Sequence, residues 1–264
     1  MLTGARGGDA KGTRFRVVEH VQVRRYRELN VFKIGGAVAG GGRGAGTRAR
    51  ILETALASFR DRGYDQTTMR AIAQAAGVSL GIAYYHFGSK EQLVQEFYLG
   101  IQAGHRRRAA AALRKRDFVD RLRGVLRAGI DEMTPYHTFA GSFIRVAIPP
   151  SSPASPFSPE SATARQAALS LFRDVVEGSR NRPGGVLAQD LPHLLWLAYL
   201  ALTVFWVYDT SPDQERTRQL ADAAARMVGN LATLSRLPVL RGAVNDLHVL
   251  LADLLQQTEP EGAV

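Results

Sequence analysis

One stretch of the chain, Thr47 to Glu96, constrains the fold more than any other. Apolar residues recur at three- and four-residue spacing from Ile51 to Phe59, which predicts an amphipathic helix. Gly63 is placed to end this helix, because glycine readily takes the positive φ found at helix C-termini. Thr67 or Thr68 is then expected to cap a second short helix.

A third short helix is expected over residues 79–87, with Gly77 making the turn that precedes it. Ser89 and Gln92 have the spacing of a capping box, which opens a fourth helix that runs through about Arg108. Two short helices joined by a tight turn form the arrangement that places one helix in the major groove of DNA. The stretch therefore predicts a DNA-binding helix-turn-helix.

The remainder of the chain is also predicted to be helical, because strand-type alternation is nearly absent after residue 46. A segment rich in proline and serine, residues 149–159, is expected to be a loop. The other expected helices cover residues 118–134, ended by Pro135, and residues 160–179, 187–208, 212–235 and 240–257. The predicted fold class is all-α, with a three-helix N-terminal domain over residues 47–93 and a larger helical domain over residues 94–264.

The N-terminal segment has a different composition. Eleven Lys and Arg against three Asp and Glu in residues 1–50 leave +8 of the net charge of +10 in the first fifth of the chain. Glycines crowd residues 35–46, and their backbone entropy disfavours regular structure. We expect residues 1–46 to form a disordered, basic, glycine-rich arm. Such an arm attracts phosphate groups, and a solvated tail without a ligand fits the composition equally well.

The helix-turn-helix stretch resembles the DNA-binding domain of TetR-family transcriptional regulators over about a fifth of the chain. The small residues at positions 73, 76 and 77 suit a close crossing of two short helices, and Val78, Tyr84 and Phe87 are expected to form the core beneath them. The matching positions are Ile51, Ala55, Phe59, Gly63, Tyr64, Thr67, Thr68, Ile72, Ala73, Ala76, Gly77, Val78, Ser79, Gly81, Tyr84, His86, Phe87, Ser89 and Lys90.

The resemblance implies particular contacts with double-stranded DNA. Thr68 would bind a phosphate through its hydroxyl and backbone N–H, and Arg70 would reach base edges. Four residues would face the groove and three would contact phosphates and sugars: Ser79, Leu80, Gly81 and Ile82 for the groove, and Tyr85, His86 and Lys90 for the backbone.

Two positions depart from the family pattern. Leu80 is apolar where relatives often carry a polar side chain, so contact with a thymine methyl replaces a hydrogen bond to a base. Ala83 stands where relatives have a larger apolar residue, which predicts a slightly underpacked domain.

For the C-terminal domain, the resemblance implies a homodimer interface and a pocket for a small-molecule effector. The helices near residues 187–208 and 212–235 are apolar enough to form a four-helix interface, in which Ala221, Ala224, Ala225 and Gly229 would allow close approach. Burial within one subunit explains each of these residues equally well. The candidate pocket residues are Tyr136, His137, Phe139, Phe143, Phe172, Trp196 and Tyr199, any of which is also suited to an ordinary core. Few charges lie in these helices, so the expected effector is largely apolar.

The sequence therefore predicts a homodimeric regulator, a repressor released from a near-palindromic operator by a small apolar effector. A constitutive dimer that binds DNA or a protein partner without a small ligand is the main alternative. The sequence itself does not distinguish a repressor from an activator.

Two other motifs are weaker. Gly77 to Gly81 matches the nucleophile elbow of α/β-hydrolases around Ser79, but that elbow follows a strand, and a helix is expected here. Gly41 to Gly46 has the outer glycine spacing of a phosphate loop without its lysine. We therefore expect no enzyme activity and no cofactor.

The composition also bears on metals, membranes and compartment. The chain has no cysteine, and its six histidines show no metal-ligand spacing, so no metal site is predicted. Leu194 to Tyr208 is free of charge, but it is shorter than the ~20 residues of a membrane span. No apolar signal segment is evident near the N-terminus, and the expected location is the cytoplasm.

Overall fold

The computed structural model describes residues 43–182 and 186–234, together with residues 242, 246 and 249. These residues form helices joined by turns, with no strand among them, so the all-α prediction is confirmed. The helices are α2 (Arg43–Arg62), α3 (Met69–Ala75), α4 (Leu80–His86), α5 (Lys90–Ala109), α6 (Phe118–Met133), α7 (His137–Ala147), α8 (Ala162–Glu177), α9 (Val186–Tyr208) and α10 (Glu215–Leu234). Residues 1–42 of the predicted arm (1–46) and the predicted helix over 240–257 lie outside the described continuous segments, whereas residues 43–46 of that arm are helical.

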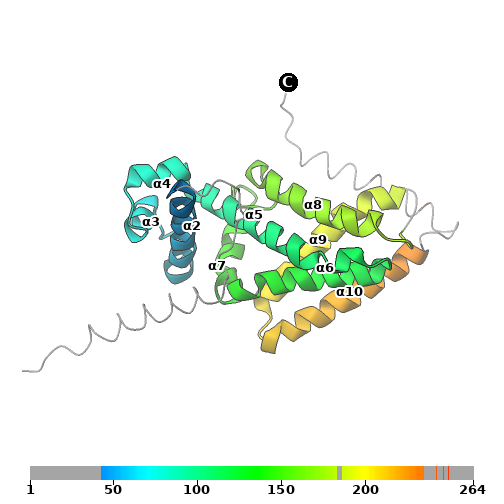
Figure 1. The fold of residues 1–264 in the computed structure, drawn as a ribbon. Coiled ribbons are helices and arrows are strands. Elements are labelled where there is room, and N and C mark those ends of the chain that lie inside the picture. Colours follow the sequence, from blue (N-terminus) through cyan, green and yellow to red (C-terminus); the bar gives the residue numbers. More distant parts are fainter. Residues whose placement is uncertain (1–42, 183–185, 235–241, 243–245, 247–248, 250–264) are drawn as a thin grey trace, which may run out of the picture.

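Two groups of helices are joined by α5. Figure 1 shows α2, α3 and α4 gathered at one end of the molecule, with α5 leading from them into a bundle of α6 to α10. The predicted boundary between residues 93 and 94 falls inside α5, which is continuous and contributes Leu93 and Val94 to one core. The N-terminal domain is thus attached through a rigid helix.

The core of the N-terminal domain follows the predicted stripe on α2. Ile51, Leu52, Ala55, Leu56 and Phe59 are all buried. The helix begins at Arg43, four residues before the predicted boundary at Thr47. Each glycine in a helix costs about 1 kcal/mol relative to alanine, but adding residues to an existing helix gains one hydrogen bond apiece. Because the buried stripe already holds the rest of α2 in place, the helix extends toward its N-terminus through Gly44 and Gly46.

The tight turns form as predicted. Gly63 has a φ of +83° and Gly77 a φ of +66°, values that residues with a side chain rarely take. Thr68 is the N-cap of α3, since its Oγ1 accepts a hydrogen bond from Ala71 N at 3.2 Å. Thr67 is instead buried, and its hydroxyl donates to Gly63 O at 2.7 Å. Thr67 therefore fixes the turn that leads into α3.

Helix α7 was not expected, because Pro135 was interpreted as the end of helical structure. A short 3₁₀ turn, Thr134–Tyr136, carries the proline near its start and leads directly into α7. Proline is tolerated in the first turn of a helix, where its missing N–H has no partner to lose. Pro135 therefore lies in the turn that ends α6 and leads into α7.

Arg121 on α6 ties together three parts of the bundle. Its guanidinium donates to the carbonyl oxygens of Asp174 (2.6 Å), Val175 (3.2 Å) and Lys115 (2.7 Å), and to that of Leu113. The carbonyls of Asp174 and Val175 also accept from Gly178 N and Ser179 Oγ, so the guanidinium adds further hydrogen bonds at this end of α8. A buried arginine thus stabilises the end of α8 and fixes its position beside the start of α6.

The small residues of α10 pack against α6 of the same chain. Ala221, Ala225 and Gly229 are buried, and a Cβ at Gly229 would clash with Cγ2 of Val119. Their predicted use for close approach between subunits is therefore wrong, because their face of α10 is already occupied. The opposite face of α10 is apolar and exposed, at Leu220, Met227, Leu231 and Leu234.

Among the described residues, α9 is the one helix whose length and composition would suit a membrane span, with a mean hydropathy of 1.5. It packs against α8, α7, α10 and α6. Leu191, Leu195, Trp196, Tyr199, Leu202 and Trp206 are its buried hydrophobic residues. This packing is that of a bundle helix.

Candidate functional site

The helix-turn-helix is fixed by hydrogen bonds between neighbours in sequence. Ser79 is the N-cap of α4, and its Oγ accepts a hydrogen bond from Ile82 N at 3.2 Å. Gly77 N donates to Gln74 O and Val78 N donates to Ala73 O, which closes the turn after α3. Helix α4 is therefore held at a defined angle to α3 by groups that sequence reasoning identified.

The outward face of α4 is unusually apolar and exposed. Tyr85 is 85% exposed, Tyr84 48% and Ile82 44%. A Cβ at Gly81 would meet only Ser79 Oγ at 3.9 Å, so internal packing does not require glycine there. Exposed aromatic and apolar side chains on a short helix indicate a surface that contacts another molecule.

The remaining predicted DNA contacts lie around this face, with some differences. Arg70 and Thr68 are exposed, and His86 is half-buried with its ring 5.2 Å from that of Tyr85. Leu80 is half-buried and packs against the core, so only part of it can face a groove. Tyr84 was expected in the core, yet its side chain is largely exposed, because the fully buried Ala83 and Phe87 occupy the inward face of α4.

Lys90 is held by Tyr64, a contact that sequence reasoning did not anticipate. Lys90 Nζ donates to Tyr64 O at 2.8 Å and lies 3.9 Å from the centroid of the Tyr64 ring. The Tyr64 hydroxyl donates to Glu91 Oε1 at 2.8 Å. Burial and this hydrogen bond raise the pKa of Tyr64 well above its ordinary value. The start of α5 is thereby fastened to the turn after α2.

Ser79 does not have the setting of a hydrolase nucleophile. Helix α3 and a turn precede it instead of a strand. Its Oγ is engaged as the cap of α4, and no described histidine or carboxylate forms a hydrogen bond with it. The turn explains Gly77 and the cap explains Ser79, the central residues of the motif.

A second candidate site is a cavity of about 360 Å³ inside the bundle. Helices α5, α6, α7, α8 and α9 line it, together with the loop that follows α7. Ile148, Phe157 and Val204 line it and are exposed, so the cavity reaches the surface there. Its volume lies in the range of small-molecule sites, ~300–1,000 Å³.

Of the predicted pocket residues, Tyr136, Phe143, Trp196 and Tyr199 line this cavity. Phe139 and Phe172 lie behind the lining, with their rings 5.6 Å from Phe143 and 5.7 Å from Tyr199 respectively. The Nε2–H of His137 donates to Trp206 O at 2.9 Å, and the two rings are 4.9 Å apart. These three residues support the cavity wall.

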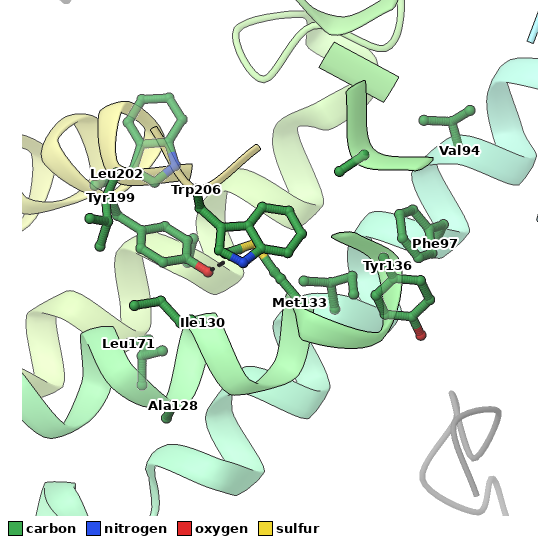
Figure 2. Packing of buried hydrophobic residues seen from close by; sticks show 14 of the residues in the cluster. Val94, Phe97, Ala128, Ile130, Met133, Tyr136, Leu171, Tyr199, Leu202 and Trp206 are labelled. Carbon is green, nitrogen blue, oxygen red and sulfur yellow. Dashed lines mark hydrogen bonds between the residues drawn. The ribbon is translucent and has the colours of Figure 1, made fainter. Parts of the chain in front are cut away.

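Other lining residues were missed by sequence reasoning. They include Phe97 and Gln102 from α5, Phe157 from the proline-rich loop, Arg165 from α8 and Trp206 from α9. Figure 2 shows Phe97 beside Tyr136, and the Tyr199 hydroxyl directed at the Met133 sulfur, 3.7 Å away. The periodicity of α5 indicated a buried face, but no local signal shows which buried residues border an unfilled space.

Phe143 connects the cavity to the N-terminal domain. Phe143 lines the cavity, and its ring also contacts the rings of Phe97 (5.1 Å) and Phe59 (6.1 Å). Phe59 lies on α2, and its ring is 5.1 Å from that of Tyr64. A continuous series of aromatic contacts therefore runs from the cavity to the residue that holds Lys90.

Comparison with known proteins agrees with this architecture. A model described as bacterial regulatory proteins, tetR family, matches residues 51–97, and a second, described as tetracyclin repressor-like, C-terminal domain, matches residues 121–250. The chain is 36% identical over 97 residues to the HTH-type transcriptional repressor KstR2 of Mycobacterium tuberculosis H37Rv, covering 34% of this chain and 46% of that protein. It is 45% identical over 53 residues to the probable acrEF/envCD operon repressor of Escherichia coli K12, covering 20% and 24% of the two chains.

These sequence matches span less than half the length of each relative. A crystal structure of a TetR-family transcriptional regulator from Syntrophomonas wolfei superposes with a TM-score of 0.58 at 17% identity, covering 71% of this chain and 96% of that chain. This likeness concerns the fold, and it extends over both groups of helices. With its helix-turn-helix and its C-terminal bundle each matched, the chain belongs to the TetR family of transcriptional regulators.

Proposed function

We propose that the protein is a cytoplasmic, homodimeric repressor that binds a near-palindromic operator and is released by a small, largely apolar effector. The observation that carries the DNA-binding part is the outward face of α4, where Tyr85 is 85% exposed on a helix that Ser79 caps and Ala83 anchors in the core. Two such helices in a dimer would enter successive major grooves, roughly 34–36 Å apart.

The contacts divide into two classes. Tyr85 and His86 would bind phosphates and sugars, and so fix the register of the protein on DNA. Arg70, Ser79, Gly81 and Ile82 would face base edges, with Leu80 at the margin. Thr68 uses its oxygen to accept from Ala71 N, which leaves its O–H free to donate to a phosphate. Lys90 has three N–H donors, of which Tyr64 takes one, so the others would reach a phosphate.

The dimer interface would be the exposed face shared by α9 and α10. On α10 the exposed residues Leu220, Met227, Leu231 and Leu234 recur at spacings of seven, four and three. On α9, Ala198, Ala201, Phe205 and Tyr208 are also exposed at helical spacing. Two apolar stripes on each subunit supply the four helices of a symmetric interface.

The effector would occupy the cavity between α5 and α9. Because Phe143 both lines the cavity and contacts Phe59, a ligand that moves Phe143 changes how α2 sits on the bundle. Binding would then favour a conformation in which the two α4 helices no longer match the DNA repeat. The existence of the cavity supports this reading over a constitutive regulator without a ligand.

The direct test is selection of bound sequences from a random DNA library, followed by gel-shift measurements on the selected site. We expect Tyr85→Ala to weaken binding to all sequences, and Arg70→Ala to change the preferred base at one position. Arg116→Ala is the matched control for loss of a positive charge. Arg116 is exposed and follows the far end of α5, roughly 30 Å of helix away from α4.

Absence of any enriched sequence would contradict the proposal. So would unchanged operator affinity and preference in both variants. A third variant, Lys90→Ala, tests the phosphate contact, and it should reduce affinity without changing sequence preference.

A further inference from the structure

The polar groups on the wall of the cavity carry information about the ligand. The identity of that ligand rests on the proposed function, in which the cavity holds a largely apolar effector. Among the lining residues, Arg165 is the only charged one, and apolar or aromatic side chains make up most of the rest. A few polar groups in such a site fix which ligand it takes.

Trp206 presents a hydrogen-bond donor without an acceptor. Its side chain is 2% exposed and lines the cavity, and the indole Nε1 has no hydrogen-bond partner among the described residues. Nearly all buried polar groups in proteins have a partner. Figure 2 shows the indole nitrogen on the side of the ring that faces Tyr199. Met133 Sδ, a weak acceptor, already receives the Tyr199 hydroxyl. An oxygen atom on a ligand would satisfy the Trp206 N–H.

Arg165 is a positively charged side chain that has no ion-pair partner among the described residues. Its Nη1 donates to the carbonyl oxygens of Pro156 (2.8 Å) and Ser158 (3.0 Å), which fastens the guanidinium to the loop over the cavity. Its other N–H groups have no acceptor, and no carboxylate pairs with it, in the part of the chain that the structure describes. Guanidinium and carboxylate form strong paired hydrogen bonds. A carboxylate is therefore the complementary ligand group.

We propose that the cavity binds an apolar carboxylic acid whose carboxylate pairs with Arg165 and whose hydrocarbon body carries one further oxygen that accepts from Trp206 Nε1–H. Gln102 also lines the cavity, and its Oε1 has no partner among the described residues, so it is a second polar atom on the wall that could accept the proton of a ligand hydroxyl. A hydroxy or keto acid would form hydrogen bonds with more of the polar groups that line the cavity than an acid with a plain hydrocarbon chain.

The fluorescence of the chain's own tryptophans can measure ligand binding in the cavity. It has two tryptophans, Trp196 and Trp206, and both line the cavity. Trp196→Phe leaves Trp206 as the single tryptophan fluorophore, and Trp206→Phe leaves Trp196. Titration of the full-length protein followed by tryptophan emission therefore measures binding in this cavity without DNA, so its outcome does not depend on operator binding.

The carboxylate contact is tested with decanoic acid and decan-1-ol. We expect decanoic acid to bind at least tenfold more tightly than decan-1-ol to the unaltered protein, since hydrogen bonds to charged groups are the stronger ones. Arg165→Met should abolish this preference and Arg165→Lys should keep most of it. Equal affinities for acid and alcohol, or a preference that survives Arg165→Met, would overturn this assignment.

The second contact is tested with 3-, 5-, 7- and 9-oxodecanoic acid, which move a carbonyl oxygen along the chain. We expect one isomer to bind about three- to tenfold more tightly than decanoic acid, the range for a neutral hydrogen bond. Trp206→Phe should remove that advantage while leaving the affinity for decanoic acid nearly unchanged. If no isomer exceeds decanoic acid, or if the advantage persists in Trp206→Phe, the indole contact is wrong. Failure of both series alongside intact operator binding would reject the ligand assignment and leave the DNA-binding function standing.

Discussion

The ring of Phe143 in α7 meets the ring of Phe59 in α2 edge-on, with centroids 6.1 Å apart and planes at 82°. This contact joins the cavity wall to the N-terminal domain. The N-terminal helices also contact α5, for example through the ion pair of Arg48 with Glu96 at 2.5 Å. The Phe143–Phe59 pair is thus a direct route by which the bundle can influence α2.

We predict a measurable coupling energy between these two rings. In a double-mutant cycle with Phe59→Leu and Phe143→Leu, urea unfolding should give an interaction of about 1 kcal/mol, as for other aromatic pairs. The control cycle combines Phe59→Leu with Phe172→Leu, because the Phe172 ring contacts Tyr199 on α9. That pair should be additive to within about 0.5 kcal/mol. Equal values in both cycles would mean that the contact carries no specific coupling.

The exposed stripe of α10 provides a test of the proposed dimer. Met227→Glu or Leu231→Glu would place a carboxylate in an apolar interface, which raises the dimer dissociation constant by roughly 100-fold. Thr233→Glu is the control, because Thr233 is exposed and lies well around the helix from the stripe. Sedimentation velocity distinguishes the species. A dimer that tolerates both stripe variants would place the interface elsewhere.

We predict that burial of His105 makes the free energy of unfolding fall in mild acid. Its side chain is 1% exposed, and burial lowers its pKa to about 4, against an ordinary value of 6.5. The Nε2–H donates to Val125 O at 2.8 Å, while Nδ1 has no partner among the described residues. The unfolded chain therefore binds a proton that the folded chain rejects, and stability falls between about pH 6.5 and pH 4.

The expected loss from His105 is about 3 kcal/mol over that range. Urea unfolding at pH 7, 6, 5 and 4 measures it. His193, whose pKa is also lowered by burial and by Arg173, acts in the same direction, so the comparison must isolate His105. His105→Gln should be less stable at pH 7 but should lose much less on acidification. Parallel curves for the two proteins would show that His105 does not titrate as argued.

Asp209 predicts a stability effect at the start of α10. Burial opposes ionisation of its carboxylate, but hydrogen bonds from Ser211 and Thr217 outweigh this and lower its pKa well below the ordinary value. Oδ2 accepts from Thr217 N and Oγ1 at 2.8 and 2.6 Å. Asp209→Ala should cost about 3 kcal/mol at pH 7, because a buried backbone N–H loses its partner. The difference between the two proteins should shrink below about pH 4, where the unfolded carboxyl protonates. A thermal melt unchanged by the substitution would contradict this role.

Local sequence signals account for the N-terminal domain. The stripe on α2, the positive φ of Gly63 and Gly77 and the cap at Ser79 all depend on residues within a few positions of one another. The burial of Tyr84 was predicted wrongly because it depends on how α4 is rotated against α3, and the buried Ala83 and Phe87 set that rotation. Recognition of a motif therefore gave the helices but not which of its aromatic residues lies inside.

The bundle was less predictable, because its key features join distant segments. The small residues of α10 suit any close approach, and only the position of Val119 on α6 shows that the approach is within the subunit. Pro135 is equally suited to ending one helix and beginning the next. The proposed roles of Arg165 and Trp206 rest on a missing ion-pair partner and a missing hydrogen-bond acceptor among the described residues, and no sequence pattern shows that such a partner is missing.

In the proposed mechanism, helix α5 would transmit a movement of the cavity wall to the N-terminal domain. It is unbroken from Lys90, at the edge of the DNA-binding domain, to Ala109, and Phe97, Ile101 and Gln102 along it border the cavity. Its twenty residues span roughly 30 Å, so a tilt of about 5° displaces its far end by about 2.6 Å. In a two-fold symmetric dimer the displacement doubles, to about 5 Å, against a groove repeat of roughly 34–36 Å. In the proposed dimer, a ligand that tilts α5 by only a few degrees would therefore be enough to end the match between the two α4 helices and successive major grooves.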